Sequence, residues 1–262
     1  MVQKILGFSG RKQSGKNTCA NVIFGWEMIS LGITRNFSIS ECGQLVISDI
    51  FGDDSKEGIL DIMSSRQPVR EFLSEHLDYL VKLYSFADLL KKNVCMDILG
   101  LTREQCYGTD EEKNSNTHIE WGIMPFENSR DKSDKVTARE LMQYVGTDFF
   151  RKMYPNVWAD ATIRKIKEDS SHMAIVTDCR FPNEVEAIKN AGGKVIRLSR
   201  NSQNKDVHSS EVALDKDNYD WSNFDSIIQN ESIPVGEQNK ILYDLLKEWG
   251  WLELSISQGL EQ

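Results

Sequence analysis

A glycine-bounded loop near the start of the chain has the residue types and spacing of a phosphate-binding site. It reads Gly10-Arg11-Lys12-Gln13-Ser14-Gly15-Lys16 and follows a short apolar run. Glycines allow the backbone to curl so that successive N–H groups point toward phosphate oxygens, and the helix expected after the loop adds its dipole. Lys16 would then reach the terminal phosphates of a nucleotide. An accidental glycine-rich turn is the alternative, which the flanking strand and helix patterns disfavour.

The residue after Lys16 departs from the usual pattern of such loops. A serine or threonine hydroxyl commonly binds Mg²⁺ at that position, whereas this chain has Asn17 followed by Thr18. The hydroxyl ligand is therefore either displaced to Thr18 or absent. A second metal candidate is Asp178, which ends an apolar strand at the sheet edge where ligands usually bind. A helix N-cap is the other interpretation of this aspartate.

Two arginines have the chemistry needed to bind phosphate and to stabilise the charge of phosphoryl transfer. Arg180 follows Asp178 by two residues, next to the predicted sheet edge. Arg139 lies in the first turn of a predicted helix, where a basic side chain opposes the helix dipole. We therefore expect Arg139 to bind a ligand rather than to stabilise the helix. Glu184 lies in the first turn of the helix that begins at Pro182, and either helix stabilisation or ligand binding explains it.

The helix that carries Arg139 begins with a capping box formed by Thr137 and Glu140. Gly146-Thr147-Asp148 interrupts its pattern with a small residue, which either allows a ligand to approach the backbone or kinks the helix. Trp158 either stacks on a base or fills the core. The residues of this helix that we expect to point inward are Leu141, Val145 and Phe149.

Strand and helix patterns alternate along the chain, which predicts a parallel sheet with helices on both faces. The predicted strands are residues 4–8, 81–86, 173–177, 194–198 and 226–228. Helices are predicted from Gly15 to Leu31, after Pro68, from Ala87 to Leu99, after Thr137, near Asn156, after Pro182 and from Pro234 to Trp249. Trp249 and Trp251 indicate either a core contact or a subunit interface.

Two stretches have weaker patterns. Residues 34–66 are ambiguous, because 44–51 has a strand pattern whereas 53–56 and 64–65 look like solvated turns. Residues 108–135 are rich in Asp, Glu, Lys, Asn and Ser, which predicts an exposed or mobile segment. This segment is either a surface loop or a functional lid.

The composition excludes several classes of protein. Of 262 residues, 40% are hydrophobic and 27% charged, which is typical of a folded globular protein. The net charge of −9 repels polyanions, so we expect no direct nucleic-acid binding, and an anionic ligand needs a local basic patch. The five cysteines form no CxxC pair and the four histidines no HExxH pattern, so neither disulfides nor zinc are indicated and a reducing cytosol fits best. No apolar run or signal-peptide pattern predicts contact with a membrane.

Five sequence features occur in an informative order and spacing. They are the Gly15-Lys16-Asn17 step, Phe86-Ala87-Asp88-Leu89-Leu90-Lys91, the run Arg139-Glu140-Leu141-Met142-Gln143-Tyr144-Val145-Gly146-Thr147-Asp148, Trp158, and Thr177-Asp178-Cys179-Arg180-Phe181-Pro182-Asn183-Glu184. The chain thereby resembles the phage deoxynucleoside monophosphate kinase family over residues 2–31 and about 80–212. Eukaryotic phosphomevalonate kinases are similar at the phosphate loop.

The resemblance implies a P-loop NTPase fold, a three-layer α/β/α architecture with a parallel central sheet and an inserted, mostly helical acceptor or lid region. Residues 1–262 would form a single kinase domain, with 108–135 as a mobile insertion or lid within it. The implied reaction is the ATP-dependent, Mg²⁺-assisted phosphorylation of a deoxynucleoside monophosphate to the diphosphate. The implied location is the cytoplasm, that of the host if a phage encodes the protein, and a homodimer is an open expectation.

The resemblance also implies roles for individual residues. The catalytic residues would be Lys16, Arg139 and Arg180. The ATP-binding residues would be Gly10, Gln13, Ser14, Gly15, Lys16, Asn17 and Thr18, although the family commonly has arginine at the position of Gln13. The acceptor-binding residues would be Lys12, Leu90, Lys91, Arg139, Gly146, Thr147, Trp158, Asp178, Arg180 and Glu184. Thr18 and Asp178 would hold Mg²⁺, through water.

Some of these implied roles have alternatives. Lys91 is equally explained as a solvated helix residue. His208-Ser209-Ser210-Glu211 matches a family HxSE pattern, which we interpret as an anchor of its loop rather than as catalytic. A kinase for another small phosphorylated acceptor and a nucleotide-binding protein that transfers nothing are the alternative functions. The departures from the usual pattern at Asn17 and Gln13 leave open the second alternative, nucleotide binding without transfer.

Overall fold

A five-stranded parallel sheet organises the first of two units into which the chain divides. The computed structural model describes residues 3–50, 53–64, 66–125, 131–200 and 212–252. The first unit comprises Met1–Tyr84 and Ile163–Gln262, and the second comprises Ser85–Thr162. The chain thus leaves the first unit after a strand and returns to it within a helix.

The order of strands across the parallel sheet is β10-β9-β1-β8-β5. Their bounds are β1 (Lys4–Ser9), β5 (Val81–Tyr84), β8 (Met173–Cys179), β9 (Lys194–Leu198) and β10 (Ser226–Ile228), which confirms all five predicted strands. In the middle strand, Ser9 pairs with Arg197 of β9 and with Cys179 of β8. The carboxyl ends of three parallel strands therefore meet where the phosphate loop begins, at the edge where ligands bind in such sheets.

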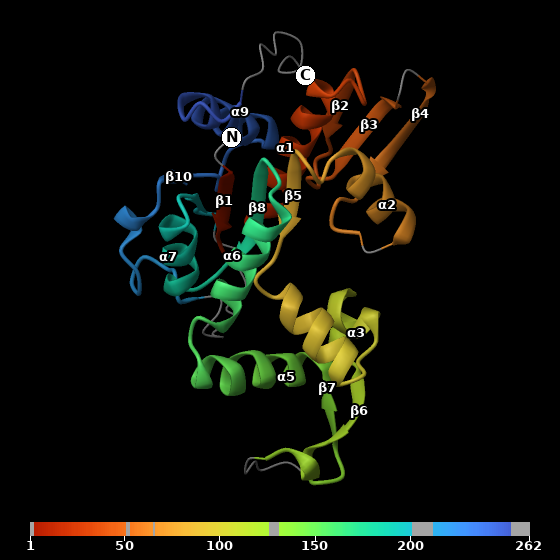
Figure 1. Ribbon diagram of the computed structural model, residues 1–262, viewed down its shortest axis with the longest axis vertical. Helices are drawn as coiled ribbons and strands as arrows, with labels where there is room; N and C mark the ends of the chain where they lie inside the picture. Colours follow the sequence, from red (N-terminus) through yellow and green to blue (C-terminus); the bar gives the residue numbers. More distant parts are fainter. Residues whose placement is uncertain (1–2, 51–52, 65, 126–130, 201–211, 253–262) are drawn as a thin grey trace. The chain divides into compact units, whose positions relative to one another are not determined.

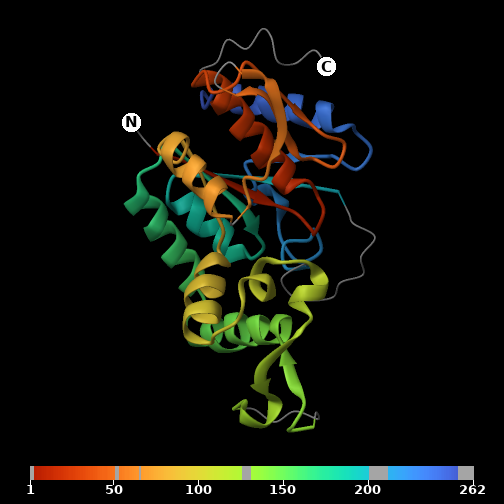
Figure 2. The same cartoon turned by 90° about the vertical axis from the view of Figure 1, so that its right-hand side faces the viewer.

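Helices cover both faces of this sheet, which confirms the predicted three-layer architecture (Figures 1 and 2). One layer holds α1 (Lys16–Ser30) and α9 (Val235–Glu248), and the other holds α7 (Pro182–Asn190) and the part of α6 (Val157–Asp169) that belongs to this unit. Side chains of β1 alternate between the layers. Leu6 and Phe8 join the core cluster that contains residues of α1 and α9, whereas a Cβ on Gly7 would lie 2.6 Å from Ile188 of α7.

A smaller antiparallel sheet follows α1 in the sequence. It contains β2 (Asn36–Ile39), β3 (Leu45–Ile50) and β4 (Asp53–Leu60) in that order, and α2 (Gln67–His76) comes next. The strand predicted at 44–51 is confirmed. The turn predicted at 53–56 is wrong, because these residues begin β4, where pairing with β3 outweighs the low strand propensity of Asp, Ser and Lys. Of the turn expected at 64–65, residue 65 lies outside the described residues.

The second unit consists of short helices and a two-stranded hairpin (Figure 1). Its elements are η1 (Leu90–Ile98), α3 (Arg103–Tyr107), α4 (Asp110–Lys113), β6 (Asn116–Glu120), η2 (Trp121–Ile123), β7 (Lys135–Thr137), α5 (Ala138–Gln143) and η3 (Tyr144–Arg151). The polar segment 108–135 therefore carries α4, β6 and η2, while residues 126–130 lie outside the described residues. Its mobility, and the expectation that 1–262 form one kinase domain, remain predictions.

Two helices of the second unit, η1 and η3, are π-helical. They approach closely at Gly146, where a Cβ would lie 2.5 Å from Cδ2 of Leu90. Leu141 is buried as predicted, but the inward orientation expected for Phe149 is wrong, since this residue is 50% exposed. An i→i+5 hydrogen-bond pattern winds more residues into each turn, so the 3.6-residue spacing no longer holds after Tyr144.

The chain's last described elements are η4 (Trp221–Asn223), β10 and α9, which confirms the helix predicted at 234–249. The longest described helix, α1, has 15 residues. Within the described ranges, no helix combines the length and apolar character that crossing a membrane requires.

We expect Gly25→Ala to destabilise the first unit, because Gly25 of α1 lies under the ring of Phe37 in β2. A Cβ there would lie 2.5 Å from Cε2 of the ring. Alanine in a helix is favourable by about 1 kcal/mol over glycine, but overpacking costs roughly 1–3 kcal/mol. Urea unfolding should therefore show a lower midpoint for Gly25→Ala and an unchanged or higher one for the control Gly236→Ala, since a Cβ at Gly236 of α9 meets open space. Equal midpoints for the two variants would contradict this packing argument.

Candidate active site

The phosphate loop joins β1 to α1 through a backbone that curls back on itself. Gly10, Gln13 and Gly15 have φ angles of 157°, 63° and 96°, which belong to the left-handed region. A Cβ on Gly10 would collide with Oγ of Ser14, so the curl requires glycine there. The N–H of Ser14 donates to the carbonyl of Arg11 at 3.2 Å, which closes the turn.

The N-terminus of α1 is left open to a ligand. Gly15 is its N-cap, no described side chain caps the helix, and its first turn contains no acidic residue. By contrast, α5 begins with the predicted capping box of Thr137 and Glu140. Uncapped N–H groups at a helix N-terminus carry partial positive charge and bind anions. The start of α1 is therefore suited to phosphate.

Lys16 supplies a buried cation at the same place. Its Nζ donates to the carbonyl oxygens of Gly10 at 2.7 Å and Arg11 at 2.6 Å, and to Oγ of Ser14 at 3.3 Å. The residue is only 8% exposed. Burial, followed by the nearby positive charges of Arg180 and Arg197, lowers the pKa of Lys16 to about 7, while the carboxylate of Asp178 raises it. An anion bound in the loop would restore the charged form.

Asp178 and Arg180 lie at the end of β8, beside the loop. The N-cap of α7 is Phe181, so the N-cap interpretation of Asp178 is not supported. The carboxylate of Glu184 instead accepts hydrogen bonds from the backbone N–H groups of Arg180 at 2.7 Å and Phe181 at 3.0 Å. Glu184 is 1% exposed, so this buried carboxylate stabilises the turn that carries Arg180.

Four residues that the sequence analysis does not single out surround the loop. Nδ2 of the fully buried Asn230 donates to the carbonyl of Ser14 at 2.7 Å and to Oε1 of Gln238 at 2.6 Å. Oδ1 and Oδ2 of Asp215 accept hydrogen bonds from Arg11, and Oδ1 also accepts one from Arg197. The position of Asn230, two residues beyond the carboxyl end of β10, is the one signal in the sequence that could have indicated it.

Few side chains near the loop could serve as ligands for a metal ion. The hydroxyl of Thr18 packs against Gly43, where it occupies the space that a Cβ would take. Nδ2 of Asn21, one turn further along α1, donates to the carbonyl of Gly43 at 2.7 Å. Among the described residues, no group of three or more His, Cys, Asp or Glu side chains could hold a metal ion. Asp178 remains as a carboxylate at the loop, which fits Mg²⁺ held mainly by phosphates and water.

Two of the predicted acceptor residues of the second unit, Arg139 and Trp158, donate hydrogen bonds within that unit. Arg139 donates from Nε to Asn114 and from Nη2 to Asp110, both at 2.8 Å. Nε1 of Trp158 donates to the carbonyl of Gly146 at 3.0 Å, and Trp158 is 6% exposed, which favours its interpretation as a core residue.

The remaining candidates have these positions. The ammonium of Lys91 lies 4.8 Å from the ring centroid of Tyr107, Leu90 packs at Gly146, and Thr147 lies in η3. In the first unit, Gln13 and Asn17 are exposed and Lys12 is half-buried. The segment His208 to Glu211 lies outside the described residues.

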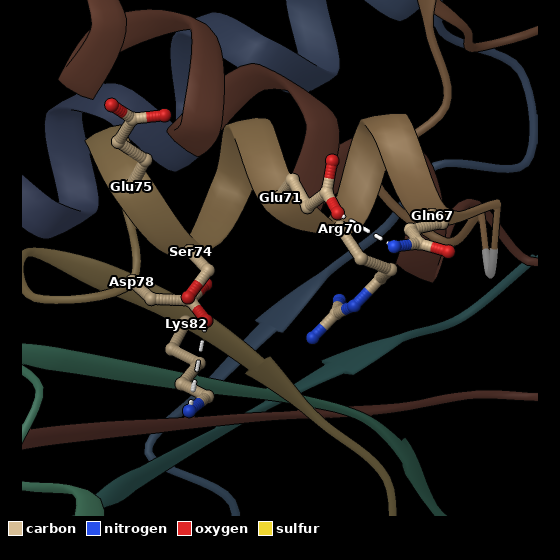
Figure 3. Close-up of a pocket in the computed structure, with 7 residues that line it drawn as sticks. All are labelled: Gln67, Arg70, Glu71, Ser74, Glu75, Asp78 and Lys82. Carbon is tan, nitrogen blue, oxygen red and sulfur yellow. Dashed lines mark hydrogen bonds and ion pairs between the residues drawn. The ribbon is translucent and has the colours of Figure 1, made fainter.

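A cavity of about 680 Å³ lies elsewhere in the first unit (Figure 3). Its walls are charged and polar side chains of α2 and the start of β5, with Gln67 bonded to Glu71 and Lys82 paired with Asp78. No residue of the phosphate loop lines it. The loop, not this cavity, carries the chemistry described above.

Comparison with known proteins shows which family the chain belongs to. The family model described as deoxynucleotide monophosphate kinase matches residues 4–235. The chain belongs to the deoxynucleotide monophosphate kinase family. It is 32% identical over 164 residues to the "Putative deoxynucleotide monophosphate kinase" of Acanthamoeba polyphaga mimivirus, a match that covers 58% of this chain and 77% of the relative. It is 33% identical over 55 residues to the "Deoxynucleoside-5'-monophosphate kinase" of Escherichia phage T5, which covers 21% of this chain and 22% of that relative.

Membership of this family confirms the resemblance found in the motifs. As a deoxynucleotide monophosphate kinase, the chain is a phosphotransferase. The family match begins at the first residue of β1, includes the whole second unit and ends at the first residue of α9 in the first unit.

The pKa of Lys16 leads to a prediction about proton uptake by the kinase. Above the pKa of about 7 the free enzyme holds Lys16 neutral, whereas bound phosphates favour the ammonium form, so binding draws a proton from the buffer. Calorimetry with ATP as the probe at pH 8, in buffers of different ionisation enthalpy, should show uptake approaching one proton. The affinity should fall as the pH rises from 7 to 9, by at most roughly tenfold per pH unit. Lys16→Met should show no uptake, and an absence of uptake in the unmodified protein would contradict the assignment.

Proposed function

We propose that the protein transfers the γ-phosphoryl group of ATP to the phosphate of a deoxynucleoside monophosphate, which yields ADP and a deoxynucleoside diphosphate. The observation that carries this proposal is the buried ammonium of Lys16 at the uncapped N-terminus of α1, where three neutral oxygens hold it. This arrangement is complementary to a polyphosphate. The names of the matching family and relatives support a deoxynucleoside monophosphate as acceptor.

The loop would bind and orient ATP with its backbone and with Lys16. Phosphoryl transfer passes through a transition state with little covalent help from the enzyme, so positioning and charge stabilisation supply most of the rate. The N–H groups at the start of α1 would hold the phosphates, with Gly10, Gln13, Ser14, Gly15 and Asn17 shaping the loop. Lys16 would donate to the group in transfer, and its proton stays on Nζ throughout.

Mg²⁺ would assist through Asp178. A bound Mg²⁺ neutralises charge on the β and γ phosphates. Asp178 lies near enough to Lys16 for its charge to raise the pKa of that lysine, so a metal on the phosphates would lie within reach of this carboxylate, directly or through water. Thr18 is the weaker candidate, because its hydroxyl packs against Gly43.

Four basic residues would hold the phosphate of the acceptor, and each has different neighbours in the structure. Lys12 and Arg180 belong to the phosphate-loop side, and Glu184 supports Arg180 by accepting its backbone N–H. In the second unit, Arg139 is oriented by Asp110 and Asn114, and its side chain is 38% exposed. We assign it to the acceptor phosphate, together with Lys91.

Four further residues complete the proposed acceptor site. Leu90, Gly146 and Trp158 would shape this site through the contacts they make with one another, and Thr147 through its place in η3.

We propose the cytoplasm as the location, that of the host if a phage encodes the protein. A homodimer stays a proposal.

Incubating the protein with ATP, Mg²⁺ and a panel of deoxy- and ribonucleoside monophosphates, followed by chromatography of the products, tests this function. Lys16→Met should leave the protein folded and lower kcat by roughly 10²–10³-fold, because a charge at the transferring group is lost. Lys240→Met, which removes an exposed lysine of α9, is the control and should keep full turnover. A folded Lys16→Met variant with unchanged kcat would refute the assignment of the loop.

Arginine replacements separate a kinase from a protein that only binds nucleotide. Arg180→Ala and Arg139→Ala should each lower kcat/KM for the monophosphate by roughly 10²–10³-fold and change the Kd for ATP far less. Lysine at either position should restore activity only in part, because a point charge cannot reproduce the guanidinium fork. Arg164→Ala, an exposed position of α6, is the control.

Two outcomes would contradict the kinase proposal. In the first, the unmodified protein binds ATP and transfers nothing to any monophosphate. In the second, both alanine variants turn over normally while the control does too. The alternative of a nucleotide-binding protein without transfer would then take its place.

A further inference from the structure

A carboxylate from a distant part of the chain is bound to the phosphate loop. Asp215 follows β9 in the sequence, and its Oδ1 accepts from Nε of Arg11 at 3.2 Å while its Oδ2 accepts from Nη2 of Arg11 at 2.5 Å. This is a two-point, charge-assisted contact, which fixes direction as well as distance. Arg11 is the first residue after Gly10 in the loop.

The same carboxylate also holds a buried arginine beside the loop. Nη2 of Arg197 donates to Oδ1 of Asp215 at 3.2 Å, and its Nη1 donates to Oγ of Ser9 at 3.0 Å. Arg197 is 4% exposed, and its guanidinium lies 5.1 Å from the ring centroid of Trp221. A buried guanidinium needs an anionic partner, so Asp215 is required where it lies.

The contact with Arg11 reaches Lys16 through the backbone. The carbonyl of Arg11 accepts from Nζ of Lys16 at 2.6 Å and from the N–H of Ser14 at 3.2 Å. The side chain of Arg11 is held by Asp215 and its carbonyl holds Lys16, so a single residue links the carboxylate to the ammonium.

We propose that Asp215 and Arg11 are positioning residues for phosphoryl transfer: the carboxylate fixes Arg11, and the carbonyl of Arg11 fixes the ammonium of Lys16. The inference rests on the proposed function, because it concerns how Lys16 meets the transferring phosphoryl group. It predicts loss of rate rather than loss of ATP binding, since the N–H groups of α1 still bind the phosphates when Lys16 is less well held.

The decisive variant is Arg11→Met, which breaks the link to the loop and leaves the buried pair of Arg197 and Asp215 intact. We expect kcat to fall by up to roughly 10²-fold with a much smaller change in KM for ATP and a nearly unchanged Tm. Arg11→Lys should restore part of kcat, because it keeps one charge and loses the two-point contact. The matched control is Asp169→Asn, since Asp169 forms a part-buried ion pair with Lys82 at 3.0 Å in the same unit, away from the loop.

Asp215→Asn tests the other end of the link. The double variant Arg11→Met with Asp215→Asn should lower kcat no further than the more affected single variant, because both changes break one interaction. If Asp215→Asn fails to fold, Arg11→Met and Arg11→Lys still decide. An opposite result, in which Asp215→Asn raises affinity or kcat while Arg11→Met lowers them, would overturn the proposal, because Arg11 would then bind substrate in competition with Asp215.

Hydrogen–deuterium exchange separates failure of this inference from failure of the proposed function. Arg11→Met should speed exchange of amides in residues 10–16 and leave those of α2 unchanged, whether or not the protein transfers phosphate. Exchange and kcat both equal to those of the unmodified protein would overturn the inference. Absence of transfer by the unmodified protein, with faster loop exchange in Arg11→Met, would refute the proposed function and leave only the bracing of the loop by Arg11 and Asp215 standing.

Discussion

The candidate active site depends on holding the amino group of Lys16 buried beside backbone oxygens and close to Arg180 and Arg197. Burial disfavours its charge, and the result is a pKa of about 7. The neighbouring carbonyls of Gly10 and Arg11 compensate only in part, as neutral acceptors do. Such a site favours an anion, because a phosphate group bound in the loop would stabilise the charged form of Lys16.

The parallel sheet is what allows such a site to form. Because β1 lies between β8 and β9, the ends of these strands bring Asp178, Arg180 and Arg197 to the loop from more than 160 positions along the sequence. Side chains beyond the sheet then hold the loop in shape, with Asn230 on the carbonyl of Ser14 and Asp215 on Arg11. The candidate site residues are therefore positioned by strand ends, and the loop is held by residues from the last third of the chain.

Local patterns were sufficient to predict the five strands of the parallel sheet, β3, most of the longer helices and the capping box at Thr137, because each depends on residues close together in the sequence. The residues that brace the loop could not be predicted, since Asp215 and Asn230 acquire their roles only through strand order. The same limit applies to Thr18, whose contact with Gly43 depends on the small antiparallel sheet. The orientation predicted for Phe149 is wrong for a different reason: a π-helix changes the helical period on which the prediction rests.

The charges at the loop also explain how an acidic protein can hold a polyanion. The chain has a net charge of −9, yet Lys16, Arg11, Arg180 and Arg197 gather at one sheet edge against the two carboxylates of Asp178 and Asp215. The two carboxylates differ in the charges that they offset. Asp215 neutralises guanidinium groups that burial would otherwise disfavour, whereas Asp178 lies where a cation on the phosphates would offset it. The surplus positive charge that remains is small and local, so it would favour a small anion at the loop, whereas the net negative charge of the chain disfavours larger polyanions.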